Sequence, residues 1–191
     1  MGTRYRTNLS EEPLRFVTTT FNRWLPLLKD ESYFSIIANS LNFVSSKYNT
    51  DILAYVIMPN HLHLILFFSD AVKLSDYMRD FKKYTSGELR RKLIIEKQTE
   101  VLQKLEFPVG SNHYKIWMVR FDDFAIKNAE TFHVKMNYIH QNPVRRNLSS
   151  TASEYFYSSA GFYEMEKDGL VKVTYYLDAI GWANHYTYGR I

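Results

Sequence analysis

The chain has 191 residues, of which 46% are hydrophobic and 23% charged, and its formal net charge is +4. This length and composition are typical of one globular domain and exclude a disordered or collagen-like chain. The absence of cysteine excludes a disulfide framework, a thiolate zinc site, an iron–sulfur cluster and a cysteine nucleophile. A metal would therefore need nitrogen or oxygen ligands.

The sequence pI of about 9.1 favours a polyanionic partner without requiring one. The 15 tyrosines and 13 phenylalanines could stack on nucleic-acid bases, although a large aromatic core explains them better. No apolar run approaches the roughly 20 residues that span a bilayer, and no apolar stretch follows the N-terminal charges. We therefore expect a cytoplasmic protein with no membrane partner.

The first predicted element is a strand over Leu14–Phe21, which is rich in β-branched and aromatic residues. A helix follows, with Asp30 as its N-cap and an end near Tyr48, because apolar residues recur there at steps of three and four. Two apolar runs, Ile52–Met58 and His61–Phe68, then predict a hairpin whose turn is the Pro-Asn pair between them.

Ser75 is the predicted N-cap of a second helix, which has a buried stripe and a basic outer surface. Pro and Gly mark a loop before Tyr114–Phe121, the predicted fourth strand. A further helix begins at Asn128, and Pro143 predicts its end at about Gln141 or Asn142, since proline and the residue before it disfavour helical continuation.

This order of elements predicts an α+β fold of the ferredoxin-like, RRM-like split βαβ type. An antiparallel sheet would carry two helices on one face, and an appended tyrosine-bearing helix or a ligand would occupy the other. We expect residues 1–191 to form a single domain, with residues 148–191 as a C-terminal packing extension.

His61 and His63 open the second strand of the hairpin. Because strand side chains alternate, both imidazoles project from one face, where two neutral nitrogens can converge on a divalent metal. A pair of surface or hydrogen-bonded histidines is the alternative, and the short pattern by itself favours that reading.

Tyr138 and Asn142 are four residues apart in the last predicted helix, so the hydroxyl and the amide can face a common site. In the alternative reading, Tyr138 is an amphipathic core residue and Asn142 merely ends the helix. These two residues alone do not establish a site.

From Arg15 to Tyr163 the chain resembles the HUH-type Y1 transposases of the IS200/IS605 group, and within them the REP-associated tyrosine transposases. The resemblance is carried by VIMPNHLHLIL, LSDYMRDFKKYTS, YIHQNPVRRNL and EYFYSSAGFY. It is specific because MPNHLHL and YIHxNPVR occur together, in this order and at this distance. One departure is Met118 after Trp117, where the family has Trp-Gln.

This resemblance implies an enzyme that cleaves and rejoins single-stranded DNA carrying a hairpin. It implies that His61, His63 and Asn142 hold Mg²⁺ or Mn²⁺ and that Tyr138 attacks the phosphodiester to form a 5′-phosphotyrosine intermediate. Lys135, one turn before the tyrosine, could add positive charge. Relatives of this kind act as homodimers or monomers, so a homodimer is possible here.

We also expect DNA contacts from basic residues on the second helix and after the tyrosine helix, although a solvated charged surface explains them nearly as well. These candidates are Lys82, Lys83, Arg90, Arg91, Arg145 and Arg146. Two other functions compete with the transposase: a noncatalytic nucleic-acid-binding module on an RRM-like sheet, and a metal-dependent phosphoesterase that uses activated water.

Overall fold

A computed structural model describes residues 12–69 and 74–180. One four-stranded sheet lies at its centre, with the order β2-β3-β1-β4 and every neighbouring pair antiparallel. Its strands are β1 (Leu14–Thr20), β2 (Thr50–Met58), β3 (His61–Phe68) and β4 (Asp122–Ala125). This order confirms the predicted ferredoxin-like α+β fold.

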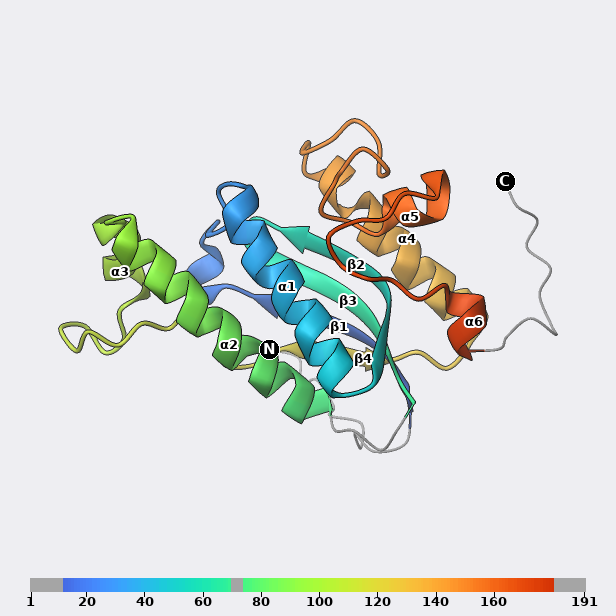
Figure 1. Ribbon diagram of the computed structural model, residues 1–191, viewed down its shortest axis with the longest axis horizontal. Helices are drawn as coiled ribbons and strands as arrows, with labels where there is room; N and C mark the ends of the chain where they lie inside the picture. The colour runs from blue at the N-terminus through green and yellow to red at the C-terminus, as the bar shows by residue number, and fades with distance from the viewer. Residues whose placement is uncertain (1–11, 70–73, 181–191) are drawn as a thin grey trace, which may run out of the picture.

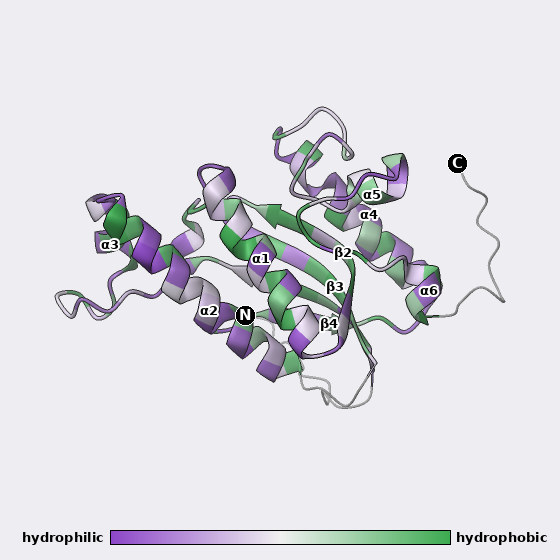
Figure 2. Cartoon of the chain, viewed as in Figure 1, coloured by the Kyte–Doolittle hydropathy of each residue, from purple (hydrophilic) through white to green (hydrophobic). Residues whose placement is uncertain are grey.

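Helices α1 (Glu31–Lys47) and α2 (Leu74–Ile95) cover one face of the sheet, where Val17, Leu62 and Leu64 join their apolar stripes in one buried cluster. Figure 1 shows these two helices side by side, and α4, α5 and α6 grouped apart from them. In the hydropathy colouring of Figure 2 the strands are largely hydrophobic, whereas much of the α2 ribbon is hydrophilic. The amphipathic periodicity read from the sequence thus produces this layer.

Helix α1 begins where the sequence predicts, because the Asp30 side chain accepts a hydrogen bond from the Ser32 amide at 2.9 Å. The prediction of Ser75 as an N-cap is wrong, since α2 already includes Leu74 and Ser75 lies within its first turn. Serine is favourable at an N-cap but is also tolerated inside a helix, so its presence does not fix the boundary.

Helix α4 (Ala129–Arg145) packs on the other face, where Phe132 and Ile139 meet Phe16 and Ile65 of the sheet in a second buried cluster. Asn128 caps it by accepting from the Thr131 amide at 2.8 Å. The predicted appended helix therefore has the predicted place. Its predicted end was wrong, because α4 continues through Pro143 to Arg145. So close to the C-terminus, proline removes a single hydrogen bond from the last turn.

The predicted fourth strand, Tyr114–Phe121, is wrong: the strand that pairs with β1 is β4, after that segment. Trp117 in the segment is buried, stacks on Phe21 with ring centroids 4.0 Å apart, and donates its indole N–H to Thr85 at 2.9 Å. The Lys82 amine donates to the Met118 carbonyl at 2.9 Å. The backbone pairs with the end of β1 only over a short stretch, where Trp117 forms an isolated antiparallel bridge with Phe21 and the Met118 amide donates to the Thr20 carbonyl at 2.9 Å. Side-chain packing and this single bridge hold the segment in place of a continuous ladder.

Shorter helices complete the described part of the chain. They are η1 (Asn22–Trp24), α3 (Thr99–Leu105), α5 (Ala160–Met165) and α6 (Tyr176–Ile180). None was predicted, since each is too short to show a clear apolar periodicity. Within residues 12–69 and 74–180, no helix is both long enough and apolar enough to cross a membrane.

The chain after α4 returns to β2, which is an edge strand of the sheet. The Ile57 amide donates to the Tyr157 carbonyl at 2.8 Å, and Ser158 forms an antiparallel bridge with Val56. This return covers the free edge of β2, which would otherwise be open to pairing with another chain. A packing extension over residues 148–191 stays a prediction, because residues 181–191, with Trp182, lie outside the described part.

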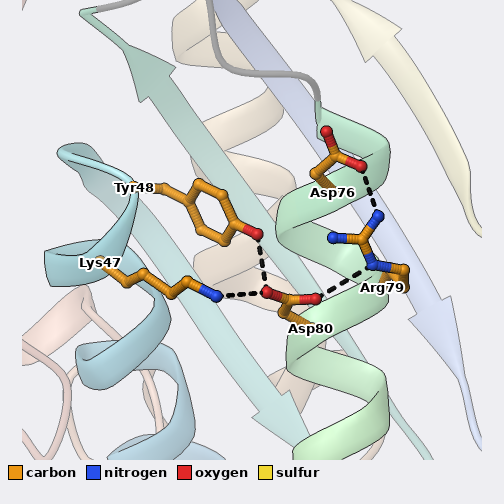
Figure 3. Close-up of polar contacts among 5 residues, drawn as sticks. All are labelled: Lys47, Tyr48, Asp76, Arg79 and Asp80. Atoms are coloured by element: carbon orange, nitrogen blue, oxygen red, sulfur yellow. Dashed lines mark hydrogen bonds and ion pairs between the residues drawn. The ribbon is translucent and has the colours of Figure 1, made fainter.

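A charged network joins the end of α1 to the start of α2 (Figure 3). Asp80 accepts from Lys47 at 2.6 Å, from Tyr48 at 2.7 Å and from Arg79 at 3.0 Å, and Arg79 also pairs with Asp76 at 2.6 Å. These hydrogen bonds hold the pKa of Asp80 well below its usual value. The network lies in the layer of α1 and α2, away from the face of the sheet that carries the histidines.

Candidate active site

His61 and His63 lie on the face of β3 that α4 covers. In the antiparallel register, His63 lies opposite Thr18 and His61 opposite Thr20 of β1. Their ring centroids are 4.8 Å apart, and the side chains are 5% and 4% exposed. The predicted convergence of the two imidazoles is present, because alternation along β3 turns the intervening Leu62 to the opposite face.

Each imidazole has a partner for its Nδ1 atom. His61 Nδ1 lies 2.6 Å from the side-chain oxygen of Asn60, and His63 Nδ1 lies 2.8 Å from Thr18 Oγ1. The buried Nε2 atom of His63 has no hydrogen-bond partner among the described residues. When Nδ1 donates to these oxygens, each Nε2 retains its lone pair, which is the arrangement of a metal-binding histidine and its supporting shell.

Both histidines are held in the neutral form. Burial lowers the pKa of His61 to about 4, assisted by the positive charge of Arg146. Burial also lowers the pKa of His63 to about 3, with smaller contributions from His61 and Lys135. Near pH 7 both rings are therefore unprotonated, as coordination to a metal requires.

Tyr138 of α4 lies against the second histidine of this pair. Its ring centroid is 5.1 Å from that of His63 and 6.0 Å from that of Phe16, in edge contacts. The side chain is 37% exposed, so a substrate can reach it. The structure therefore brings together a phenol and two imidazoles that are far apart in sequence.

Asn142 lies one helical turn beyond Tyr138 and is buried. Its side-chain oxygen has no hydrogen-bond partner within the described residues. A buried carbonyl oxygen without a partner costs roughly 1–3 kcal/mol, so a ligand that it could bind would relieve that cost. Like His63 Nε2, it is a buried polar atom in this layer that has no partner within residues 12–69 and 74–180.

The donor set fits a divalent cation. The described residues contain no cluster of three His, Cys, Asp or Glu side chains that could hold a metal. Two imidazole nitrogens and an amide oxygen are nonetheless a suitable partial set for Mn²⁺, or for Mg²⁺ that keeps several waters and binds a phosphate oxygen. The observations that support this fit are His63 Nε2 and Asn142 Oδ1, two buried atoms without a hydrogen-bond partner in the described part of the chain.

Three of the predicted basic residues lie at this site. Lys135 Nζ lies 4.8 Å from the ring centroid of Phe16, and the Arg145 guanidinium lies 5.5 Å from that of Tyr138. Arg146 is near enough for its charge to lower the pKa of His61. An anionic backbone approaching Tyr138 would therefore meet positive charge from both ends of this part of α4.

The predicted basic residues of α2 are not brought to the site, since α2 belongs to the layer on the opposite face. Lys82 donates to the carbonyls of Met118 and Arg120, and burial lowers its pKa to about 8. Arg91 pairs with Glu88 at 2.7 Å. DNA binding by Lys82, Lys83, Arg90 and Arg91 stays a prediction, and Lys82 already has a role in fixing the chain before β4.

Sequence reasoning missed a contact that positions the tyrosine helix. His140 is buried, and its Nε2 lies 2.9 Å from Ser159 Oγ, which accepts from the Tyr55 amide of β2 at 3.0 Å. Ser159 thus connects α4 to the sheet. The SSA segment of the family resemblance contained this serine, but only the fold shows that His140 and Ser159 meet.

Known proteins were compared by sequence and by fold. No curated protein matches the sequence. A solved structure, described as a REP-associated tyrosine transposase bound to a REP hairpin, has the same fold: the TM-score is 0.64, with 20% identity over 91% of this chain and 92% of the other. A candidate transposase of Deinococcus radiodurans R1 matches with a TM-score of 0.47 and 11% identity, over 71% and 95% of the two chains.

The decisive comparison is with a family model. The model described as "Transposase IS200 like" matches residues 14–142. This range is more than half of the chain and includes both strand histidines, the helix tyrosine and the asparagine that follows it. The chain belongs to the family of IS200-like transposases.

Proposed function

We propose that this transposase cleaves and rejoins single-stranded DNA, with Tyr138 as the nucleophile and with a divalent cation, Mg²⁺ or Mn²⁺, held by His61, His63 and Asn142. The observation that carries the proposal is the position of the Tyr138 ring on α4. It lies 5.1 Å from the His63 ring and is still open to solvent. By contrast, the exposed phenol of Tyr84 belongs to α2, in the other layer, where its ring stacks on a phenylalanine.

The protein's own residues would prepare the site before DNA arrives. Asn60 and Thr18 orient the two rings, and burial keeps both rings neutral. When bound, the cation would neutralise and polarise the scissile phosphate. The packing of α4 on Phe16 and Ile65 would hold the phenol in line with that phosphate.

In the cleavage step, the Tyr138 oxygen forms a bond to phosphorus and the bond between phosphorus and the 3′ oxygen breaks. The phenol proton leaves to a base or to water, and the departing 3′ oxygen takes up a proton to become a hydroxyl. The guanidinium of Arg145 and the amine of Lys135 lie where they would favour developing negative charge. The 5′-phosphotyrosine keeps the energy of the phosphodiester, so another 3′ hydroxyl can displace Tyr138 and rejoin a strand.

The substrate we propose is single-stranded DNA with a hairpin, as at the ends of a REP-like or IS200-like element. The similar solved structure is of a protein bound to a REP hairpin. Arg145 and Arg146 would contact phosphates beside the cleaved bond, and each contact would contribute to the salt dependence of binding. A homodimer stays a prediction, as does the single domain of residues 1–191.

The noncatalytic alternative requires an open sheet face on which bases stack. Here α4 packs on that face, and the Tyr138 ring lies against Phe16 of β1 and His63 of β3. A phosphoesterase that uses activated water would leave Tyr138 without a role. A covalent intermediate distinguishes that enzyme from the one proposed.

The test is incubation of the full chain with Mn²⁺ and single-stranded hairpin oligonucleotides, followed by denaturing electrophoresis. We expect an adduct that survives denaturation, disappears in Tyr138→Phe and persists in Tyr84→Phe. Tyr84 is a matched control because it is half exposed on α2, in the opposite layer. Cleavage without an adduct would favour the phosphoesterase, and DNA binding without cleavage would favour the binding module.

A further inference from the structure

Trp24 is an exposed indole at the border of the candidate active site. It ends the short turn that follows β1 and is 52% exposed. Its ring centroid lies 5.9 Å from that of His61, with the planes 60° apart. Indoles usually bury most of their large apolar surface, so an exposed one beside a candidate metal ligand calls for an explanation.

The backbone holds this indole outward. Trp24 and the residue before it both have a φ of 58°, a left-handed conformation that is unfavourable for large side chains. The flanking chain is fixed, because Phe21 donates to the Asn60 carbonyl at 3.0 Å and Leu28 to the Pro59 carbonyl at 3.2 Å. Both acceptors belong to the turn directly before His61. Strain maintained by fixed surroundings next to a reactive site points to a binding role.

We propose that Trp24 is a stacking platform for one nucleobase of the single-stranded DNA, next to the phosphodiester that Tyr138 attacks. The proposal rests on the proposed function, and it adds a substrate contact on the His61 side of the site. Stacking on an indole accepts every base, so Trp24 would hold the strand in place without reading its sequence. With the base fixed there, the adjacent phosphate would lie near the two imidazoles.

Other aromatic rings around the site are less suited to this role. Phe16 is buried beneath Tyr138 and stacks on His63. Phe124 is half exposed, but the Lys135 amine lies over its ring at 5.2 Å. Among the described residues, the ring contact of Trp24 is an edge contact with His61, and the exposed half of the indole is open to a base.

The first measurement is binding of the full chain to a fluorescent hairpin oligonucleotide with single-stranded flanks, followed by anisotropy. Trp24→Ala should weaken binding roughly five- to 150-fold, and Trp24→Phe should restore most of it. Phe43→Ala is the matched control, because Phe43 is 63% exposed on α1 in the opposite layer. Circular dichroism and thermal melting of each variant check that the fold is retained.

The second measurement replaces single bases of the oligonucleotide by abasic sites, one position at a time. If Trp24 stacks on one base, removing that base should abolish the effect of Trp24→Ala, whereas removing the others should leave it unchanged. If Trp24→Ala weakens binding by the same factor wherever the abasic site is placed, Trp24 has only a structural role and the platform is overturned.

The outcomes separate this inference from the proposed function. If the Tyr138 adduct forms and Trp24→Ala binds every oligonucleotide as tightly as the unchanged protein, the platform is overturned and the nuclease stands. If no adduct forms but one base couples to Trp24, the nuclease fails and the platform stands. If the unchanged protein binds no member of a panel of hairpin oligonucleotides whose single-stranded flanks are randomised, both fail.

Discussion

Strand β3 presents Leu62, Leu64 and Leu66 to the layer of α1 and α2, and His61 and His63 to the layer of α4. The first set joins a continuous apolar core. The second set buries two imidazoles, one of which has a nitrogen without a partner among the described residues. Buried polar groups of this kind lower stability. Strand β3 therefore adds only apolar side chains to the α1 and α2 layer, whereas on the α4 side it adds two buried polar rings to an apolar cluster.

The largest effect that this comparison predicts is a loss of chemistry without a loss of fold. His63→Ala should lower the rate of adduct formation at least about 100-fold, because it removes one of the proposed metal ligands. It should also remove the thermal stabilisation by Mn²⁺, which for the unchanged protein is about 2.7 kcal/mol at 100 times the Kd. Thermal melting with and without Mn²⁺ measures this. An unchanged Mn²⁺ shift would contradict the assignment of His63.

The opposite pattern is expected for the neighbouring residue on the other face. Leu64 is fully buried against the α1 and α2 layer, so Leu64→Ala should cost about 2–5 kcal/mol of unfolding free energy. Urea unfolding measures the loss. Mn²⁺ should still raise the melting temperature of the Leu64→Ala protein. Loss of this Mn²⁺ effect would mean that the two faces are not independent.

Acid should affect the α4 layer first. Burial lowers the pKa of His140 to about 4, so the unfolded chain, with an ordinary histidine pKa near 6.5, binds more protons between these values. The stability from neutral His140 is therefore complete above about pH 6.5 and is lost as the pH falls toward 4. His140→Asn should lower stability at pH 7 and flatten this part of the profile. Urea unfolding at pH 7 and pH 5 measures how the free energy of unfolding changes with pH. If His140→Asn leaves this change as it is in the unchanged protein, the prediction is contradicted.

The smallest expected effect on stability concerns the charged network around Asp80, between α1 and α2. The pKa of Asp80 is held below its ordinary value of 3.8, so its contribution is present above that pH and is lost as the pH falls through the lower, folded value. Asp80→Asn should lower the free energy of unfolding at pH 7 by less than any other substitution in this series, as is usual for exposed ion pairs, and by less still in high salt. Salt-independent destabilisation, measured by urea unfolding, would point to packing instead.

The sequence predicted the parts of the fold that local patterns determine. Alternation in His61–Phe68 placed both imidazoles on one face, and Asp30 marked the start of α1. The prediction failed at Tyr114–Phe121, which meets the end of β1 through one isolated bridge and is otherwise held by contacts with Thr85 and Lys82 on α2. Such contacts depend on the tertiary fold, so the sequence of the segment by itself does not predict them.

The candidate site shows the same division. The tyrosine and the histidines were found because a family resemblance joined segments that local physics could not connect. Trp24 was missed because no pattern in the sequence signals a left-handed backbone at two consecutive non-glycine residues. Ser159 was missed as a partner of His140 because the two meet only through the return of the chain to β2.

The contact between His140 and Ser159 also has a consequence for synthesis on the ribosome. The histidines, the tyrosine and the asparagine have all been translated by residue 142, but the serine that connects α4 to β2 comes 17 residues later, at position 159 (159 − 142 = 17). A nascent chain therefore contains every proposed reactive group before it contains this connection. The order of translation therefore places the residue that connects α4 to β2 after every proposed reactive group.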